Sequence, residues 1–362
     1  MSSAPIWSAL PDAPGFAAAG YAPLAESIAR LLHTQNDVLL IQGEAVVALE
    51  ASAASLGRPG LRALNIVTSM YGLWFGHWLR RAGAEVVDLA AEPGQPIRAE
   101  AVAEALAAGS FDLIAVVHAE SAYGILNPLH EIATLAREAG AMLVVDAVAS
   151  IGGHRVDVDA LGIDIAVIGP QKSLGGQAGV SALSLSPRAR ASLNPSGPAP
   201  SILSLADQVT LWLETGRGVL PGTPSALEFH AFAATLARVE AEGLGAIEAR
   251  HARAAAMARA GVAALVGQKR VAAKDASNLV TTLPLPAGIS AAEVLAHAAE
   301  GHALSAGVGP SGETMIRVNH TGPRARPEVV LGDLAVLGAA LNAAGVHVDI
   351  GQALDAANAA GR

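Results

Sequence analysis

The chain contains the stretch Ala141-Met142-Leu143-Val144-Val145-Asp146, a short apolar run that ends in a carboxylate. A second apolar run passes into a glycine-rich loop, Val167-Ile168-Gly169-Pro170-Gln171-Lys172-Ser173-Leu174-Gly175-Gly176. Short apolar runs bounded by Gly and Pro are typical of buried strands, and ligands of open α/β sheets collect at the carboxyl ends of such strands. We therefore expect Asp146 and Lys172 to lie at one edge of a sheet.

The same pattern extends outward from these two runs, because apolar runs alternate with alanine-rich amphipathic stretches. Strand–helix–strand alternation predicts an α/β fold whose mostly parallel sheet is covered on both faces. The predicted strands are 37–42, 62–68, 85–89, 113–117, 141–145, 163–168 and 180–185, and the predicted helices are 45–56, 72–82, 99–108 and 128–139.

The second half of the chain has a different organisation. Residues 186–200 are rich in Ser, Pro and Arg and predict a connection, after which helices dominate. The predicted helices here are 204–214, 225–242, 245–266, 291–299 and 327–344, and the predicted strands are 279–285 and 315–319. We predict an N-terminal segment (1–20), a large domain (21–250) and a small C-terminal α/β domain (251–362).

Composition narrows the class of protein. Of 362 residues, 52% are hydrophobic, 3% are aromatic and 15% are charged, so Ala, Val, Leu and Ile must fill the core. A chain this apolar is expected to bury further surface in an interface, which predicts a homodimer or a dimer of dimers. The net charge of −9 and the absence of a basic stretch argue against nucleic-acid binding.

Several other classes are also disfavoured. The chain has no cysteine, so disulfides and thiolate zinc sites are impossible, and its 11 histidines show no metal-binding spacing such as H-E-x-x-H. No membrane-length apolar run and no signal peptide are present, which makes the cytoplasm the expected compartment.

Lys172 and Asp146 together suit one kind of chemistry. An amine in a tight Gly/Pro loop can form a Schiff base with a carbonyl, and burial would favour its neutral, nucleophilic form. A buried carboxylate at a strand end can keep a pyridine nitrogen protonated, so the pair describes a pyridoxal site. Val148, two residues after Asp146, is placed to pack under the ring. The alternatives are a solvated lysine and a solvated or helix-capping carboxylate.

The stretch from Val144 to Ser186, with VVDAVASIGG followed by GPQKSLGGQAGVSALSLS, resembles the class V aminotransferases of PLP fold type I. Within that family it looks most like the pyridoxamine–pyruvate and alanine–glyoxylate types. The resemblance implies that Lys172 is the catalytic lysine and that Asp146 and Gln171 contact the cofactor. It implies either pyridoxal 5′-phosphate as cofactor, or free pyridoxal and pyridoxamine as covalently bound substrate.

The resemblance gives meaning to further positions. It places Tyr71 on the pyridine face, where the alternative is one more core aromatic. Ser121 follows Glu120 in a loop that lies near the cofactor O3′ and aldehyde in the family. Arg317, in Met315-Ile316-Arg317-Val318-Asn319-His320-Thr321-Gly322, matches Arg-x-x-His-x-Gly, whose arginine binds the substrate carboxylate. His320 is expected to shape the same pocket.

Glu44 is the main departure from the family pattern. Relatives usually place small Gly, Ser or Thr residues where Leu40-Ile41-Gln42-Gly43-Glu44 passes into a helix, and the amides there bind the cofactor phosphate. A carboxylate near a phosphate would be repulsive, although Glu is also a favourable residue at a helix N-terminus. Thr223, before Pro224, matches an element that reaches the partner subunit's phosphate in relatives.

These observations predict an aminotransferase that acts on a small amino or keto acid and a vitamin B6 vitamer. The favoured reaction converts pyridoxamine and pyruvate into pyridoxal and L-alanine, with Glu44 facing the 5′-hydroxymethyl group. The first alternative is a conventional PLP-dependent alanine or serine–glyoxylate (or pyruvate) aminotransferase. A cysteine desulfurase is excluded by the lack of cysteine, and a non-catalytic B6-binding homologue is disfavoured because Lys172 and Asp146 are both present.

Overall fold

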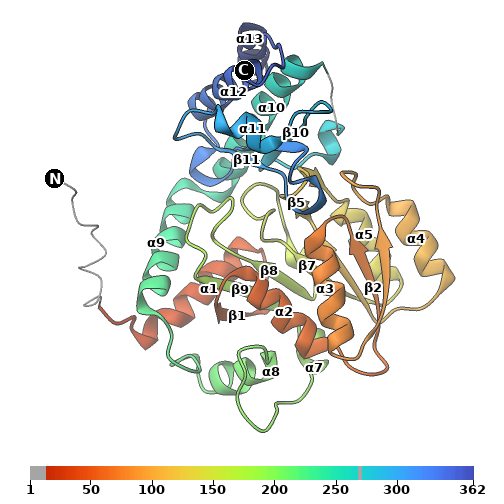
Figure 1. The fold of residues 1–362 in the computed structure, drawn as a ribbon. Helices are drawn as coiled ribbons and strands as arrows, with labels where there is room; N and C mark the ends of the chain where they lie inside the picture. Colours follow the sequence, from red (N-terminus) through yellow and green to blue (C-terminus); the bar gives the residue numbers. More distant parts are fainter. Residues whose placement is uncertain (1–13, 268–270) are drawn as a thin grey trace.

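A seven-stranded sheet forms the centre of the computed structural model, which describes residues 14–267 and 271–362 (Figure 1). Its strand order is β1-β9-β8-β7-β4-β2-β3. The strands are β1 (Asp37–Gln42), β2 (Arg62–Val67), β3 (Glu85–Ala90), β4 (Leu113–Val117), β7 (Met142–Asp146), β8 (Ile165–Ile168) and β9 (Val180–Leu185). Residues 1–13 of the predicted N-terminal segment lie outside the described residues.

The sheet is mostly parallel, which confirms the predicted fold class. Strands β3, β2, β4, β7 and β8 run parallel to one another, and β9 pairs antiparallel with β8 on one side and β1 on the other. Asp146 is the last residue of β7, where it is in register with Val117 of β4 and Val167 of β8. The carboxyl end of the central strand therefore carries the predicted ring-binding carboxylate.

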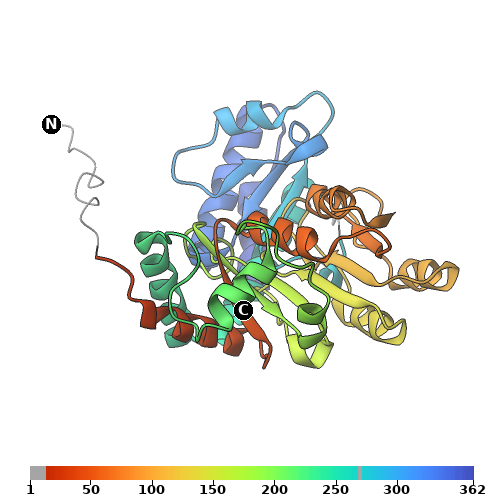
Figure 2. The same ribbon diagram turned by 90° about the horizontal axis from the view of Figure 1, so that it is seen from below.

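Helices cover both faces of this sheet (Figure 2). Helices α2 and α3 pack on each other and on β8, β9, β2, β3 and β4, whereas α1 packs on β1 and β9 and α5 on β7. The helices of this part are α1 (Tyr21–Leu31), α2 (Ala45–Leu56), α3 (Met70–Arg81), α4 (Ala99–Ala108), α5 (Leu129–Glu138), α6 (Val158–Leu161), α7 (Pro187–Ala191), α8 (Leu205–Gln208) and α9 (Ala226–Glu242).

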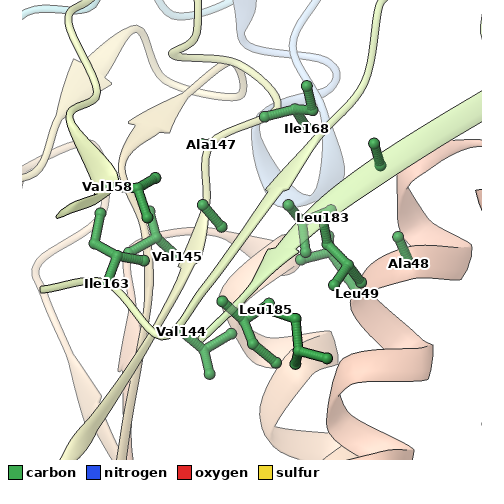
Figure 3. Packing of buried hydrophobic residues seen from close by; sticks show 14 of the residues in the cluster. Ala48, Leu49, Val144, Val145, Ala147, Val158, Ile163, Ile168, Leu183 and Leu185 are labelled. Carbon is green, nitrogen blue, oxygen red and sulfur yellow. The ribbon is translucent and has the colours of Figure 1, made fainter. Parts of the chain in front are cut away.

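Small aliphatic side chains fill the space between the helices and the sheet. Every residue of β4 and β8 is buried, which explains why these central strands are continuous apolar runs without polar alternation. Figure 3 shows Ala48 and Leu49 of α2 beside Leu183 of β9. Alanine at such contacts lets a helix approach the sheet closely, so the alanine-rich composition is used in the core as well as for helix propensity.

The C-terminal part builds a second core around a three-stranded antiparallel sheet, in the order β10-β12-β11 (Figure 1). Its elements are α10 (Leu244–Val266), β10 (Val280–Pro284), α11 (Ala291–Ala296), β11 (Leu304–Ala306), β12 (Met315–Asn319), α12 (Pro327–Ala343) and α13 (Ile350–Ala360). On α10, Ile247 belongs to the first core and Ala254 to the second. The predicted boundary at 250/251 lies between them, inside a continuous helix, and the domain limits stay a prediction.

Some elements differ from those expected. The predicted helix 204–214 is a short α-helix, α8, that continues as a π-helical turn, Val209–Leu213. The predicted connection 186–200 contains the short helix α7, which Ser186 caps and Pro187 opens, both favourable residues for a helix start. A short antiparallel pair, β5 (Ala119–Glu120) and β6 (Ile125–Leu126), was also not predicted. No helix in the described ranges has both the length and the apolarity needed to cross a bilayer.

Candidate active site

A pocket opens at the carboxyl end of β7, between the sheet and the N-termini of α2 and α3. It brings together residues from positions 44 to 172, and six of the predicted site residues are among them. The lining residues are Glu44, Ala45, Val46, Leu49, Tyr71, Val117, Ala119, Ser121, Asp146, Val148, Ala149 and Lys172. Asp146 and Lys172 meet at one sheet edge, as the strand pattern predicted, and Glu44, more than 120 residues before Lys172, joins them.

Asp146 provides the acidic group of the pocket. The backbone N–H of Val148 donates to its Oδ1 at 3.0 Å, which fixes the orientation of the carboxylate. Burial raises the pKa of Asp146 to about 6, while the Val148 hydrogen bond and the nearby Lys172 charge act in the opposite direction. At neutral pH the group is mainly ionised, and it is an effective acceptor for a protonated ring nitrogen.

Lys172 follows β8 in a loop that is held from several sides. Gly175 adopts a left-handed conformation (φ +70°) and its N–H donates to the Lys172 carbonyl at 3.0 Å. The guanidinium of Arg238 donates to the carbonyl oxygens of Leu174, at 2.6 Å, and Gly175, at 3.0 Å. Burial lowers the pKa of Lys172, and the charge of Arg317 lowers it further, which favours the neutral amine.

Tyr71 lies in the first turn of α3. The side chain of Ser69 caps this helix and accepts from the Tyr71 N–H at 3.2 Å. The ring of Trp74 meets the Tyr71 ring edge-on, with centroids 5.6 Å apart, which limits the positions that the phenol ring can take. Burial raises the pKa of Tyr71, and the charge of Glu120 acts in the same direction, so the phenol stays neutral.

Glu44 occupies the N-terminus of α2. Its Oε2 accepts from the Val46 N–H at 2.9 Å, and its Oε1 accepts from the side-chain amide of Gln171 at 2.6 Å. Free N–H groups at a helix N-terminus form a ready anion site, and here a carboxylate of the chain itself fills it. The residues of the pocket therefore fit the pyridine ring of a B6 vitamer but do not fit a 5′-phosphate at this helix.

Arg317 lies on β12 and reaches toward the pocket from the C-terminal part. Its Nε donates to the Ala306 carbonyl at 2.9 Å and its Nη1 to the Ser121 carbonyl at 3.2 Å. The flanking Ile316 and Val318 are fully buried in the second core, which is the alternation expected for a pocket-facing arginine. The Nη2 group has no hydrogen bond to a described residue, so it is available to a carboxylate.

Four predicted site residues lie outside the pocket lining: Gln171 and Arg317, which contact Glu44 and the Ser121 carbonyl, and also His320 and Thr223. His320 is fully buried, with Nε2 2.9 Å from Thr281 Oγ1 and Nδ1 3.1 Å from the Asn278 carbonyl. Burial lowers the pKa of His320 to about 3, so it is a neutral residue that braces the end of β12. Thr223 lies in an exposed loop before α9 and does not line the pocket of its own chain.

The pattern of the sequence did not reveal the network that holds Glu120. Thr68 Oγ1 donates to Glu120 Oε1 at 2.9 Å, and Asn127 Nδ2 donates to Thr68 Oγ1 at 2.9 Å and to the Val117 carbonyl at 2.7 Å. Burial raises the pKa of Glu120 to about 7. Positions 68, 120 and 127 have no regular spacing that would predict a contact, because they come together only after the sheet forms. Among the described residues no three His, Asp or Glu side chains are grouped to hold a metal ion.

Comparisons with known proteins agree with this geometry. Residues 6–320 match the family Aminotransferase class-V, and the chain belongs to this family of fold type I aminotransferases. The pyridoxamine–pyruvate transaminase of Mesorhizobium japonicum is 34% identical over 344 residues, covering 93% of this chain and 87% of that protein. The alanine–glyoxylate aminotransferase of Drosophila melanogaster is 28% identical, covering 90% and 85%.

The solved structures give the same result. The crystal structure of pyridoxamine–pyruvate aminotransferase from Mesorhizobium loti superposes with a TM-score of 0.89 and 33% identity, covering 95% of this chain and 88% of that one. The protein is thus an aminotransferase, and its family implies dependence on pyridoxal 5′-phosphate or a related B6 compound. The residues at the ring end of the pocket fit such a compound, whereas Glu44 at the other end does not fit a 5′-phosphate.

Proposed function

We propose that this aminotransferase transfers the amino group of pyridoxamine to pyruvate, with pyridoxal and L-alanine as products. One observation carries the proposal: the Glu44 carboxylate fills the helix N-terminus that a cofactor phosphate would need. The similarity to the Mesorhizobium pyridoxamine–pyruvate transaminase supports it. In this proposal the unphosphorylated vitamer is a substrate that enters and leaves.

The ring end of the pocket binds and orients the vitamer. When bound, the vitamer supplies a carbon that exchanges an amine for a carbonyl and a ring that accepts electrons. Asp146 holds a proton on the ring nitrogen, because its ionised carboxylate accepts that N–H. Tyr71 and Val148 lie on the walls of the pocket, where one would pack against each face of the ring.

Lys172 moves protons and provides the covalent attachment. Its lowered pKa leaves more of the Nζ neutral at physiological pH than an ordinary lysine would have. A neutral amine can accept a proton from the carbon on one side of the transferred nitrogen and deliver it to the carbon on the other side. The contacts from Arg238 hold the backbone of the loop that carries this amine, and positioning is a large part of such catalysis.

The opposite end of the pocket selects the vitamer. Glu44 can accept a hydrogen bond from a 5′-hydroxyl, while Gln171 keeps the carboxylate oriented. A unit charge about 5 Å from another of the same sign, at an effective dielectric constant of about 20, is repelled by roughly 3 kcal/mol. A phosphate dianion would be repelled by more, so the free vitamer is preferred.

Arg317 and Ser121 lie where the keto acid would bind. The planar guanidinium is suited to a carboxylate, and its contacts with the Ala306 and Ser121 carbonyls orient it. Ser121 lines the pocket next to the vitamer position. Because Arg317 comes from β12 and Ser121 follows β5, the acceptor would be bound between the two cores.

The active enzyme is proposed to be a homodimer, or a dimer of dimers. Large apolar side chains are exposed in the segment around α8 and the start of α9, with Val219 68% exposed. The others are Ile202, Leu211 and Leu227. Thr223 lies in the same exposed segment, a position from which it can reach a partner subunit's pocket.

A direct comparison of substrates tests the proposal. Purified protein is assayed with pyridoxamine and pyruvate, and in parallel with PLP, L-alanine and glyoxylate, and the Kd values for pyridoxal and PLP are measured. We expect turnover with the first pair and tighter binding of pyridoxal. The similarity to alanine–glyoxylate aminotransferases makes that activity the second candidate. Retained PLP, and a Kd for PLP well below that for pyridoxal, would favour it.

A further inference from the structure

A second and larger hollow lies away from the active site, in the C-terminal part. It is a groove of about 870 Å³ between α10 and the edge strand β10. Residues 271–273 and Ala276 border it on one side, and Tyr123 and Gly124 close one end. Most of its lining is apolar, and its volume lies in the range of pockets that hold small organic molecules.

Small side chains form the wall that α10 contributes to the groove, and they leave space for a ligand. Ala256, Ala260 and Ala263 line it from one face of α10, because residues three and four apart share a face of a helix. Arg259 lies on the same face, so a guanidinium stands among methyl groups. Among the described residues that line the groove, Arg259 is the single cation, and it stands in a roomy, mostly apolar space.

Arg259 has no negative partner in the described part of the chain. Its one hydrogen bond there is from Nη1 to the Ser277 carbonyl at 3.3 Å, and it takes part in none of the ion pairs between described residues. Burial lowers the pKa of this guanidinium, and no carboxylate offsets that effect. A half-buried cation without a counter-charge favours binding of an anion.

We propose that this groove is a second ligand site, which binds an organic carboxylate with an apolar body. The carboxylate would pair with Arg259, and the apolar body would lie along the alanine face of α10 and strand β10. A carboxylate is chosen because a guanidinium binds it through two parallel hydrogen bonds.

The groove borders the loop that follows Ser121, through Tyr123 and Gly124, but it is separate from the active-site pocket. Thr282, which lines the groove, donates from Oγ1 to the Tyr123 carbonyl at 3.1 Å, and it is paired in the sheet with Arg317. A bound ligand would therefore contact the strand next to the one that carries the substrate arginine. Since Arg317 also attracts carboxylates, an experiment must separate the two arginines.

Titration calorimetry on the full-length protein makes this separation. The probes are 4-phenylbutanoate and its uncharged analogue 4-phenylbutanamide. We expect one saturable site per chain for the acid, binding at least tenfold weaker for the amide, and at least a tenfold loss of acid binding in Arg259→Gln. Arg317→Gln should leave this binding unchanged, and so should Arg253→Gln, which removes an exposed arginine from the same helix.

A second variant covers the case in which Arg259→Gln does not fold. Ala263→Phe keeps the arginine but fills the groove, so binding of both probes should fall at least tenfold. The proposal is overturned if binding is lost in Arg317→Gln but kept in Arg259→Gln. It is also overturned if the wild-type protein shows no saturable binding up to about 10 mM, a weak affinity even for a small ligand.

Discussion

The active-site pocket has a ring end, formed by Asp146 and Lys172, and a 5′ end, formed by Glu44 with its partner Gln171. The two ends differ in how their charged groups are held. At the ring end, Asp146 and Lys172 lie at the ends of adjacent parallel strands, and burial shifts the pKa of each toward its uncharged form. At the 5′ end, the Glu44 carboxylate accepts hydrogen bonds from a helix N–H and from the Gln171 amide. In the proposed mechanism the ring end performs the reaction and the 5′ end selects the vitamer.

The largest expected effect comes from removing the amine of the ring end. Lys172→Ala should lower kcat with pyridoxamine and pyruvate by about 10⁴-fold, because no other group at the pocket replaces the proton transfer. Pyridoxal binding should persist, since Asp146 and Tyr71 remain. Steady-state assays measure the first quantity and fluorescence titration the second.

A labelling experiment supplies the control for that variant. The chain has only three lysines, Lys172, Lys269 and Lys274, and Lys274 is exposed. Borohydride reduction in the presence of pyridoxal should label Lys172 in the wild type, and Lys274→Ala should label and turn over normally. Label found on another lysine in the active wild type would contradict the assignment of the ring end.

The second effect tests the acid of the ring end. Asp146→Asn keeps the shape but cannot hold a positive ring nitrogen, so we expect kcat to fall by about 10²- to 10³-fold. The preference for pyridoxal over PLP should stay the same, because Glu44 is unchanged. An Asp146→Asn enzyme within about threefold of wild-type kcat would show that this carboxylate is not needed for the reaction.

The ring end was largely predictable from the sequence, and the reason is local. Asp146 and Lys172 each follow a short apolar run that forms a buried strand, β7 and β8, so their common edge follows from the parallel topology. The alternation around Arg317 was readable for the same reason, since Ile316 and Val318 had to enter a core. Strand periodicity fixes which way a side chain points.

The contacts between distant segments were not predictable. The hydrogen bond between Glu44 and Gln171 joins residues 127 positions apart. In the network around Glu120, the Thr68–Glu120 bond joins residues 52 positions apart and the Asn127–Thr68 bond joins residues 59 positions apart. His320 was expected in the pocket because its motif contains it, but its ring turns toward Asn278 and Thr281. Such outcomes depend on how segments that are far apart in sequence pack once the strands and helices have formed, which no local pattern encodes.

A smaller effect is expected at the 5′ end, and it should change selectivity rather than rate. Glu44→Gln keeps the size and the helix contact but removes the charge, so the Kd ratio of PLP to pyridoxal should fall by about 100-fold. The value of kcat with pyridoxamine should change by less than about fivefold. Glu50→Gln removes a charge from the same helix outside the pocket lining and is the matched control. If the Kd ratio of PLP to pyridoxal were unchanged in Glu44→Gln, the 5′ end would not select the vitamer.

The smallest expected effect is the acid limb of the pH profile. Burial raises the pKa of Asp146 to about 6, so its carboxylate is mostly ionised at pH 7 and mostly protonated at pH 5. Since kcat/KM reports groups of the free enzyme, it should fall roughly tenfold between these two pH values. In Asp146→Asn this limb should disappear, because the amide does not titrate. If the limb survives in the variant, a different group at the ring end sets it, and the buried Glu120, whose pKa is raised to about 7, is the next residue to replace.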